Sequence, residues 1–302
     1  MNCTASSATD INSGIIDVLP GAAIPMVGTL NYSCTNSNGS TGWVYFCFGI
    51  KTGSGGGGYD PRQLANGSNK LNYQIYQDAA RTQIWGDRSS AYMPVILKVN
   101  VGKKATVAGQ MPLYGLIAGG QSTAFAGNYS SAFSSGNTEI VWNSTKKNTI
   151  IVPNDCNKAT PSGSFDFAVA ATVDSRCYAT TSTLDFGSVS SLATGQVTGQ
   201  ATINLQCTNG TTYKVGLDNG QNSTGGTNRS MANAVTGTLV RYDLYQDAAR
   251  SVRWGNTNGV DTLNGQSGTG VSTPITVYGQ AYPNATATAG DYSDTIAIAV
   301  YF

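Results

Sequence analysis

The sequence YQDAAR occurs twice in this chain of 302 residues, at Tyr76–Arg81 and at Tyr245–Arg250. The similarity continues on both sides, because LNYQIYQDAARTQIWGD (71–87) aligns with VRYDLYQDAARSVRWGN (240–256). Six identical residues inside a longer similar stretch indicate an internal repeat. This stretch therefore decides the fold, because it predicts that the chain contains the same domain twice.

Further pairs of segments support the repeat. These pairs are LNYSCTN (30–36) with INLQCTN (203–209), and AGNYS (126–130) with AGDYS (289–293). The spacing between partners drifts along the chain, so we place insertions in the loops between shared strands. We expect domains at 1–157 and 175–302, with residues 158–174 forming a linker and an additional strand.

The composition favours an extracellular β-protein and excludes several functions. Charged residues make up 11% of the chain, against roughly 25% in an average soluble domain, and the net charge is +1. Such a chain has no basic surface for nucleic acid. The absence of histidine removes the usual general base of a catalytic triad and most mixed-ligand zinc sites.

Alternating apolar and polar residues predict β-strands throughout. In the second copy the segments ATINLQC, YKVGLDN, LVRYDLYQ, PITVYGQA and DTIAIAVYF show this pattern, with Gly, Asn and Pro between them. We expect an all-β chain with two immunoglobulin-like, pilin-like β-sandwiches in tandem.

The six cysteines predict three disulfides and an oxidising compartment, since none of them forms a CxxC pair. The repeat selects the pairing: Cys177 with Cys207, Cys3 with Cys34, and Cys47 with Cys156 inside the first copy.

The second copy ends in an apolar strand that needs a cover. Ile296, Ile298 and Val300 alternate with smaller or polar residues up to Phe302. The strand is either paired on both sides by its own chain or open to a strand from another protein. We favour the open edge and expect Ile296, Ile298, Val300 and Phe302 to bind a chaperone or a neighbouring subunit.

The segment before Cys177 is a candidate covering strand for the first copy. Apolar residues alternate from Phe165 to Val173, whereas only two residues precede Cys3 in the first copy. We therefore expect the first domain, and not the second, to be completed by residues 164–173.

The two cysteine-led strands, the YQDAAR segments, the AGxY segments and the terminal aromatic strand together resemble the spore coat protein U family. That family includes the secreted pilins of archaic chaperone–usher pili, and a chain with two such domains resembles their tip adhesins. The resemblance implies a periplasmic chaperone, an outer-membrane usher and an adjacent pilin subunit as partners. It also implies secretion through the periplasm to the pilus tip, where a tip adhesin promotes surface attachment and biofilm formation.

Two loops of the first copy are apolar where the second copy is polar. Val27 aligns with Gln200, and Phe125 with Thr288. Apolar loop residues often cap a core, but a gain in both loops favours an exposed surface that binds abiotic or host surfaces. Its candidate residues are Ala22, Ala23, Ile24, Pro25, Met26, Val27, Leu116, Ile117, Ala124, Phe125 and Ala126, with Tyr92 and Met93 of a third apolar stretch. We place both loops at the end of the first domain that lies away from the linker.

Two other functions are weaker hypotheses. A lectin site could use Trp43, Trp85 and Trp142, although Trp85 repeats as Trp254 and so favours a core role. An enzyme would need a nucleophile and a base, and the scattered acids Asp60, Asp78, Asp87 and Glu139 offer neither. We expect no catalytic residue, metal or cofactor.

Overall fold

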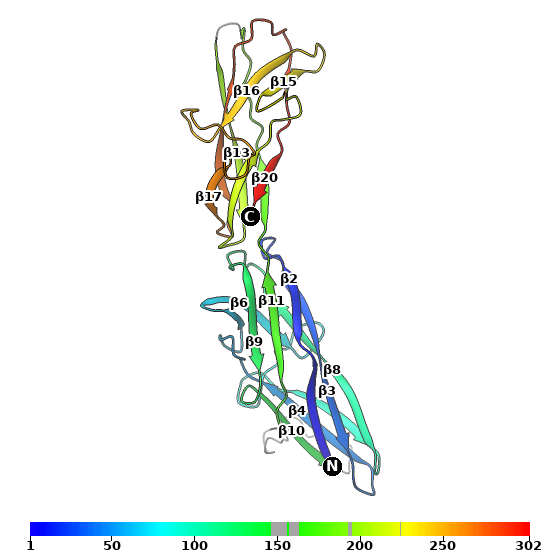
Figure 1. The fold of residues 1–302 in the computed structure, drawn as a ribbon. Helices are drawn as coiled ribbons and strands as arrows, with labels where there is room; N and C mark the ends of the chain where they lie inside the picture. The colour runs from blue at the N-terminus through cyan, green and yellow to red at the C-terminus, as the bar shows by residue number, and fades with distance from the viewer. Residues whose placement is uncertain (146–155, 157–162, 193–194, 224) are drawn as a thin grey trace. The chain divides into compact units, whose positions relative to one another are not determined.

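The computed structural model of the chain describes residues 1–145, 156, 163–192, 195–223 and 225–302. These residues form β-strands joined by turns and loops, which confirms the predicted all-β class (Figure 1). They divide into two compact units, Met1–Asp174 (the first unit) and Ser175–Phe302 (the second unit).

The strands of the first unit are β1 (Asn2–Thr9), β2 (Ile11–Ile16), β3 (Ile24–Thr35), β4 (Gly42–Ile50), β5 (Arg62–Asn66), β6 (Asn69–Tyr76), β7 (Val95–Val101), β8 (Thr106–Ile117), β9 (Gly127–Phe133), β10 (Thr138–Thr145) and β11 (Phe167–Val173). They form an eight-stranded sheet in the order β1-β3-β8-β6-β5-β9-β11-β2 and a three-stranded sheet in the order β10-β4-β7. Their apolar faces enclose one core.

The strands of the second unit are β12 (Cys177–Thr181), β13 (Val197–Cys207), β14 (Thr212–Leu217), β15 (Arg229–Asn233), β16 (Leu239–Tyr245), β17 (Leu263–Ser267), β18 (Thr273–Ala281), β19 (Tyr292–Ser293) and β20 (Ile298–Tyr301). Their sheets have the orders β12-β13-β18-β16-β15-β19 and β17-β14-β20. The first order repeats β1-β3-β8-β6-β5-β9 strand for strand. The described second unit therefore matches the first without the last two strands of its large sheet, β11 and β2.

The repeated YQDAAR sequence is a turn held by its own side chains. The carboxylate of Asp78 accepts hydrogen bonds from the backbone N–H groups of Thr82 and Gln83, at 2.9–3.2 Å. These bonds, chiefly the one from Gln83, lower the pKa of Asp78. Arg81 has a φ of 57° and donates to Gly115 O, which fixes the turn against β8. Asp247 and Arg250 repeat both arrangements, so the sequence is repeated for structural reasons.

Three disulfides join Cys3 to Cys34, Cys47 to Cys156, and Cys177 to Cys207, the pairing that the repeat predicts. Two of these disulfides link equivalent pairs of adjacent strands, β1 with β3 in the first unit and β12 with β13 in the second.

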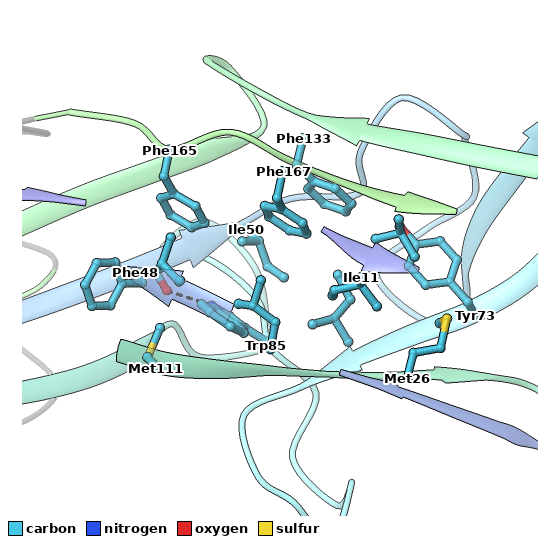
Figure 2. Packing of buried hydrophobic residues seen from close by; sticks show 14 of the residues in the cluster. Ile11, Met26, Phe48, Ile50, Tyr73, Trp85, Met111, Phe133, Phe165 and Phe167 are labelled. Carbon is cyan, nitrogen blue, oxygen red and sulfur yellow. Dashed lines mark hydrogen bonds between the residues drawn. The ribbon is translucent and has the colours of Figure 1, made fainter. Parts of the chain in front are cut away.

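Strand β11 completes the core of the first unit. It lies between β9 and β2, antiparallel to the first and parallel to the second (Figure 1). The Phe167 ring stacks on Phe133 at 4.5 Å between ring centroids, and Phe165 lies beside Phe167 (Figure 2). Val169 and Val173 are also buried. Each fully buried Phe or Val stabilises the fold by about 1.5–3 kcal/mol.

We predict that Phe167→Ala lowers the free energy of unfolding of the first unit by about 3–5 kcal/mol, because it opens a cavity between β9 and β2. Calorimetry of the full chain measures the shift of that unit's transition. Asp166→Ala is the matched control, since Asp166 is exposed beside β11. An unchanged transition in the Phe167 variant would show that β11 contributes nothing to this core.

Candidate functional site

The second unit contains a groove of about 480 Å³. One wall is the segment 181–186 and the other is the segment 292–298. Most of the lining side chains are apolar, including Leu184, Phe186, Met231, Tyr292, Ile296 and Ile298. These six are only partly buried around the second core. The groove therefore exposes apolar surface that a complete sandwich would cover.

The first wall of the groove corresponds to β2 of the first unit. Leu184 lies against Gly279 as Ile11 lies against Gly115, and both glycines lie at the same place on equivalent strands. Ile11 is fully buried, whereas Leu184 is only half-buried.

Asn12 and Asp185, which follow Ile11 and Leu184, confirm that the first wall of the groove corresponds to β2. Asn12 Oδ1 accepts the N–H of Gly14 at 2.8 Å, and Asp185 Oδ1 accepts the N–H of Gly187 at 2.7 Å. Both glycines have positive φ, as this turn requires. Asn12 and Asp185 are therefore equivalent positions.

The second wall corresponds to β9. Gly127 and Gly290 have φ values of 135° and 141°, and each lies against the amide of an equivalent asparagine. The next aromatic residues match as well, since Tyr129 donates to Phe125 O at 2.9 Å and Tyr292 to Thr288 O at 2.8 Å. Tyr129 is buried and Tyr292 is half-buried. The groove thus occupies the place that β11 fills in the first unit.

The equivalent strands β10 and β20 of the two small sheets also differ in whether a neighbouring segment covers them. In the first unit β10 bonds to the chain just before β11, with Ile140 N–H donating to Gly163 O at 2.8 Å. β20 pairs with β14 on one side, and no described segment pairs with its other side. Of the residues predicted for this edge, Ile296 and Ile298 line the groove, and Val300 packs on the core. Phe302 is 68% exposed and does not line it.

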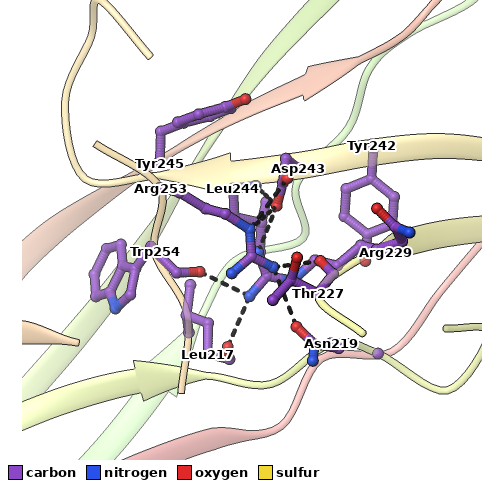
Figure 3. A network of polar contacts seen from close by, with 12 residues as sticks. Leu217, Asn219, Thr227, Arg229, Tyr242, Asp243, Leu244, Tyr245, Arg253 and Trp254 are labelled. Atoms are coloured by element: carbon purple, nitrogen blue, oxygen red, sulfur yellow. Dashed lines mark hydrogen bonds and ion pairs between the residues drawn. The ribbon is translucent and has the colours of Figure 1, made fainter. Parts of the chain in front are cut away.

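A buried ion pair supports the wall that β16 contributes to the groove (Figure 3). Arg229 Nη1 lies 2.9 Å from Asp243 Oδ1, and Arg229 Nη2 donates to Leu217 O and Trp254 O, each at 2.7 Å. Burial lowers the pKa of Arg229. Breaking such a pair leaves an uncompensated buried charge, so the network holds β16 against its neighbours.

The predicted surface residues of the first unit divide into exposed and buried groups. Ala22, Ala23, Pro25, Val27, Phe125 and Met93 are exposed, while Ile24, Leu116, Ala126 and Tyr92 are half-buried. Met26, Ile117 and Ala124 belong to the core. The pleat of β3 and β8 turns Met26 and Ile117 inward, and Ala124 is buried from the loop before β9. For these three residues the prediction of a surface role is wrong.

The structure brings the first two loops together. Gly120 N–H donates to Gly21 O at 2.9 Å, and Ile24 pairs with Ile117 at the ends of β3 and β8. Tyr92 and Met93 belong to a different loop, in which the ring centroids of Tyr92 and Tyr59 lie 6.2 Å apart and Met93 O accepts from Gly86 N–H.

The predicted position of these two loops is wrong. β11 ends at Val173, which pairs with Ile16 just before the first loop and with Gly127 just after the second. The loops therefore lie at the end of the first unit through which the chain leaves it. The prediction took the strand that follows the second loop, β9, as the last strand of the domain, whereas β11 comes later in the chain, runs antiparallel to β9 and returns the chain to this end.

The exposed apolar residues continue from the loops onto the outer face of the large sheet. Pro25 pairs with Leu116, and Val27 pairs with Tyr114 across β3 and β8. We call these four residues the apolar face. The equivalent pairs of the second unit are Thr198 with Gln280 and Gln200 with Tyr278. The two units thus share the same backbone pairing at these positions, and they differ in side chains that are apolar in the first unit and mostly polar in the second.

Sequence reasoning missed the groove residues outside the final strand. Leu184, Asp185 and Phe186 lie in a segment without strand alternation, and Met231 and Tyr242 lie on ordinary core strands. A signal was present, because Leu184 and Asp185 follow Cys177 much as Ile11 and Asn12 follow Cys3.

The described residues contain no cluster of three or more Cys, Asp or Glu side chains that could hold a metal ion. Within the same residues no helix is long and apolar enough to cross a membrane. Trp85 is fully buried and donates to Phe48 O at 2.7 Å, so it serves the core (Figure 2).

Comparisons with known proteins agree with this architecture. A family model described as Spore Coat Protein U domain matches residues 1–135 and 164–299. Protein U of Myxococcus xanthus is 30% identical over 130 residues, which are 40% of this chain and 72% of that protein.

A solved structure has the same fold along nearly the whole chain. It is a chain of the CsuC–CsuE chaperone–tip adhesion subunit pre-assembly complex from the archaic chaperone-usher Csu pili of Acinetobacter baumannii. The TM-score is 0.57 with 17% identity, covering 99% of this chain and 100% of that one.

We predict that backbone amides of residues 292–298 exchange with solvent roughly tenfold faster than those of β9, because no described strand covers their groove side as β11 covers β9. Hydrogen–deuterium exchange with mass spectrometry of the full chain measures both segments at once. Equal protection of the two segments would contradict an open groove.

Proposed function

Because the chain belongs to the Spore Coat Protein U domain family, we propose that it is the adhesin subunit of a chaperone–usher pilus. The observation that carries this proposal is the groove of the second unit, at the place that β11 fills in the first. A strand from another polypeptide completes such a sheet by β-strand addition.

The partners follow from this incomplete sheet. A periplasmic chaperone fills the groove first, and the adjacent pilin replaces it when the outer-membrane usher assembles the fibre. The first unit needs no such partner, since β11 completes it within the chain. The fold shared with the tip adhesion subunit of Csu pili supports a position at the pilus tip on the cell surface.

The apolar face is the proposed adhesive surface. Pro25, Val27 and Leu116, together with exposed Ala22, Ala23 and Phe125, offer apolar atoms to a solid surface. Such contact is weak for one molecule and strong for many pili on one cell. Attachment to abiotic apolar surfaces and biofilm formation follow from it, with no catalysis and no cofactor.

A second candidate function is glycan binding. The first unit has a shallow hollow of about 430 Å³ over β1, β3 and β8. Its lining is uncharged and rich in hydroxyl and amide groups, with Thr4, Asn31, Tyr32, Ser33 and Gln110 among its residues. Such groups suit a neutral saccharide.

We predict that Ile298→Asp reduces co-purification of the chain with its periplasmic chaperone at least about tenfold, because it places a charge in the apolar groove. Co-expression and pull-down measure the yield of complex. Ala297→Ser is the control, since Ala297 is exposed on the adjacent position. Full recovery of complex with the Ile298→Asp variant would refute the role of the groove.

We predict that the triple variant Pro25→Thr, Val27→Gln, Leu116→Gln loses most adhesion of piliated cells to polystyrene while pili still assemble. Its new residues are those of the second unit at Thr198, Gln200 and Gln280, so the sheet tolerates them. Adhesion is counted per cell, and pilus number is checked by electron microscopy.

Ser33→Gln separates the two functions. Ser33 lies on the outer face of β3, the strand that also carries Pro25 and Val27, and it lines the hollow. The glutamine introduced there is the residue of the second unit at Gln206, and its longer side chain fills the hollow. The variant leaves polystyrene adhesion unchanged if the apolar face is adhesive. Loss of adhesion or of a glycan-array signal in this variant alone would favour the lectin function.

A further inference from the structure

Two segments flank the groove, and two equivalent segments flank β11 in the first unit. We call the outward-facing residues of these flanking segments the rims, and the rims of the two units differ in charge at two positions. Asp185 stands on one rim, at the position of Asn12 in the first unit. Asp291 stands on the other, at the position of Asn128, because it follows Gly290 as Asn128 follows Gly127. Both carboxylates are exposed, and both replace amides.

In the first unit the two amides flank the outer face of β11. Asn12 pairs with Ala170 across the parallel ladder. Asn128 pairs with Thr172, and Thr172 Oγ1 lies 2.8 Å from Asn128 Oδ1. At these two positions the facing residues are neutral on both sides, Asn12 with Ala170 and Asn128 with Thr172. The carboxylate that lies on the same side as Asn12, Asp10, accepts the backbone N–H of Ala168 at 2.8 Å and meets no side-chain charge on β11 there. The inward residues Val169 and Ala171 are buried and do not meet these rims.

Neither carboxylate faces a basic residue in the groove lining that the structure describes. No Lys or Arg is among the residues that line the described groove. None of the ion pairs found between described residues involves Asp185 or Asp291. Electrostatic complementarity across an interface selects partners more than it raises affinity, so two rim carboxylates outside any of these ion pairs are suited to select a cation.

We propose that the strand filling this groove carries a Lys or Arg at an outward position corresponding to Ala170 or Thr172, and that Asp185 and Asp291 select it. This inference rests on the proposed function, which supplies the strand. The partner is thus an extended segment with apolar residues on its inward face and a basic residue on its outward face, between the two rims.

The test uses the full chain and labelled synthetic peptides. The parent peptide has the sequence of residues 163–174, GSFDFAVAATVD, which fills the equivalent place in the first unit. Two further peptides carry Ala170→Lys and Ala170→Gln, so that they differ in charge at similar length. Fluorescence anisotropy measures dissociation constants at low salt and at high salt.

We expect the Lys peptide to bind about fivefold more tightly than the Gln peptide at low salt, the range expected of two exposed ion pairs. High salt screens exposed charges and removes the difference. The double variant Asp185→Asn, Asp291→Asn also removes it, and this variant carries the residues that the first unit tolerates at Asn12 and Asn128.

The outcomes separate the two proposals. If none of the peptides binds, the groove does not accept a strand, and both the proposed function and this inference fail. If the Lys and Gln peptides bind equally at low salt, the groove stands and the selection by charge is overturned. A Lys preference that survives the double Asn variant would also overturn the role of Asp185 and Asp291.

Discussion

The packing of one strand between two others governs both units of this protein. A sandwich of this kind is closed only when a strand lies between the equivalents of β9 and β2, because the apolar side chains of that strand fill the space between the sheets. The first unit supplies the strand itself, as β11. The described second unit supplies none, so Leu184, Tyr292 and Ile298 remain half-buried. The groove and the open edge of β20 follow from this difference, and the proposed partner strand is the one that would fill the groove.

Because the chain contains the same fold twice, equivalent positions of the two units can be compared directly. Both units bury an arginine against equivalent carbonyl groups, with Arg62 and Arg229 donating to Trp85 O and Trp254 O. The side-chain partner is neutral Gln74 in the first unit and charged Asp243 in the second. Burial lowers the pKa of Arg62 to about 10, and no carboxylate pairs with it among the described contacts. The same scaffold therefore buries its arginine with either a charged or a neutral side-chain partner, while the bond to the tryptophan carbonyl is common to both copies.

The outer sheet faces of the two units also differ in their side chains. The apolar residues of the first unit do not cluster only at loop tips, because strand pairing places Pro25 beside Leu116 and Val27 beside Tyr114 on the outer face of the sheet. An apolar patch on an outer sheet face suits contact with an extended surface, whereas a small ligand needs a concave site. The second unit keeps the pairing and replaces three of these four residues with polar ones. The difference thus lies in the side chains and leaves the fold untouched.

The sequence by itself determined the all-β class, the duplication, the three disulfides and most strands of the second unit, because alternation and repetition are local or directly comparable signals. It also showed that Phe165–Val173 alternates like a strand. Only the tertiary structure decided where that strand inserts, and hence which end of the first unit carries the loops. It also decided that Met26, Ile117 and Ala124 face inward, and that Asp185 and Tyr292, the neighbour of Asp291, line opposite walls of one groove. These facts depend on pairing between residues far apart in the chain, and a pattern of neighbours along the chain does not record such pairing.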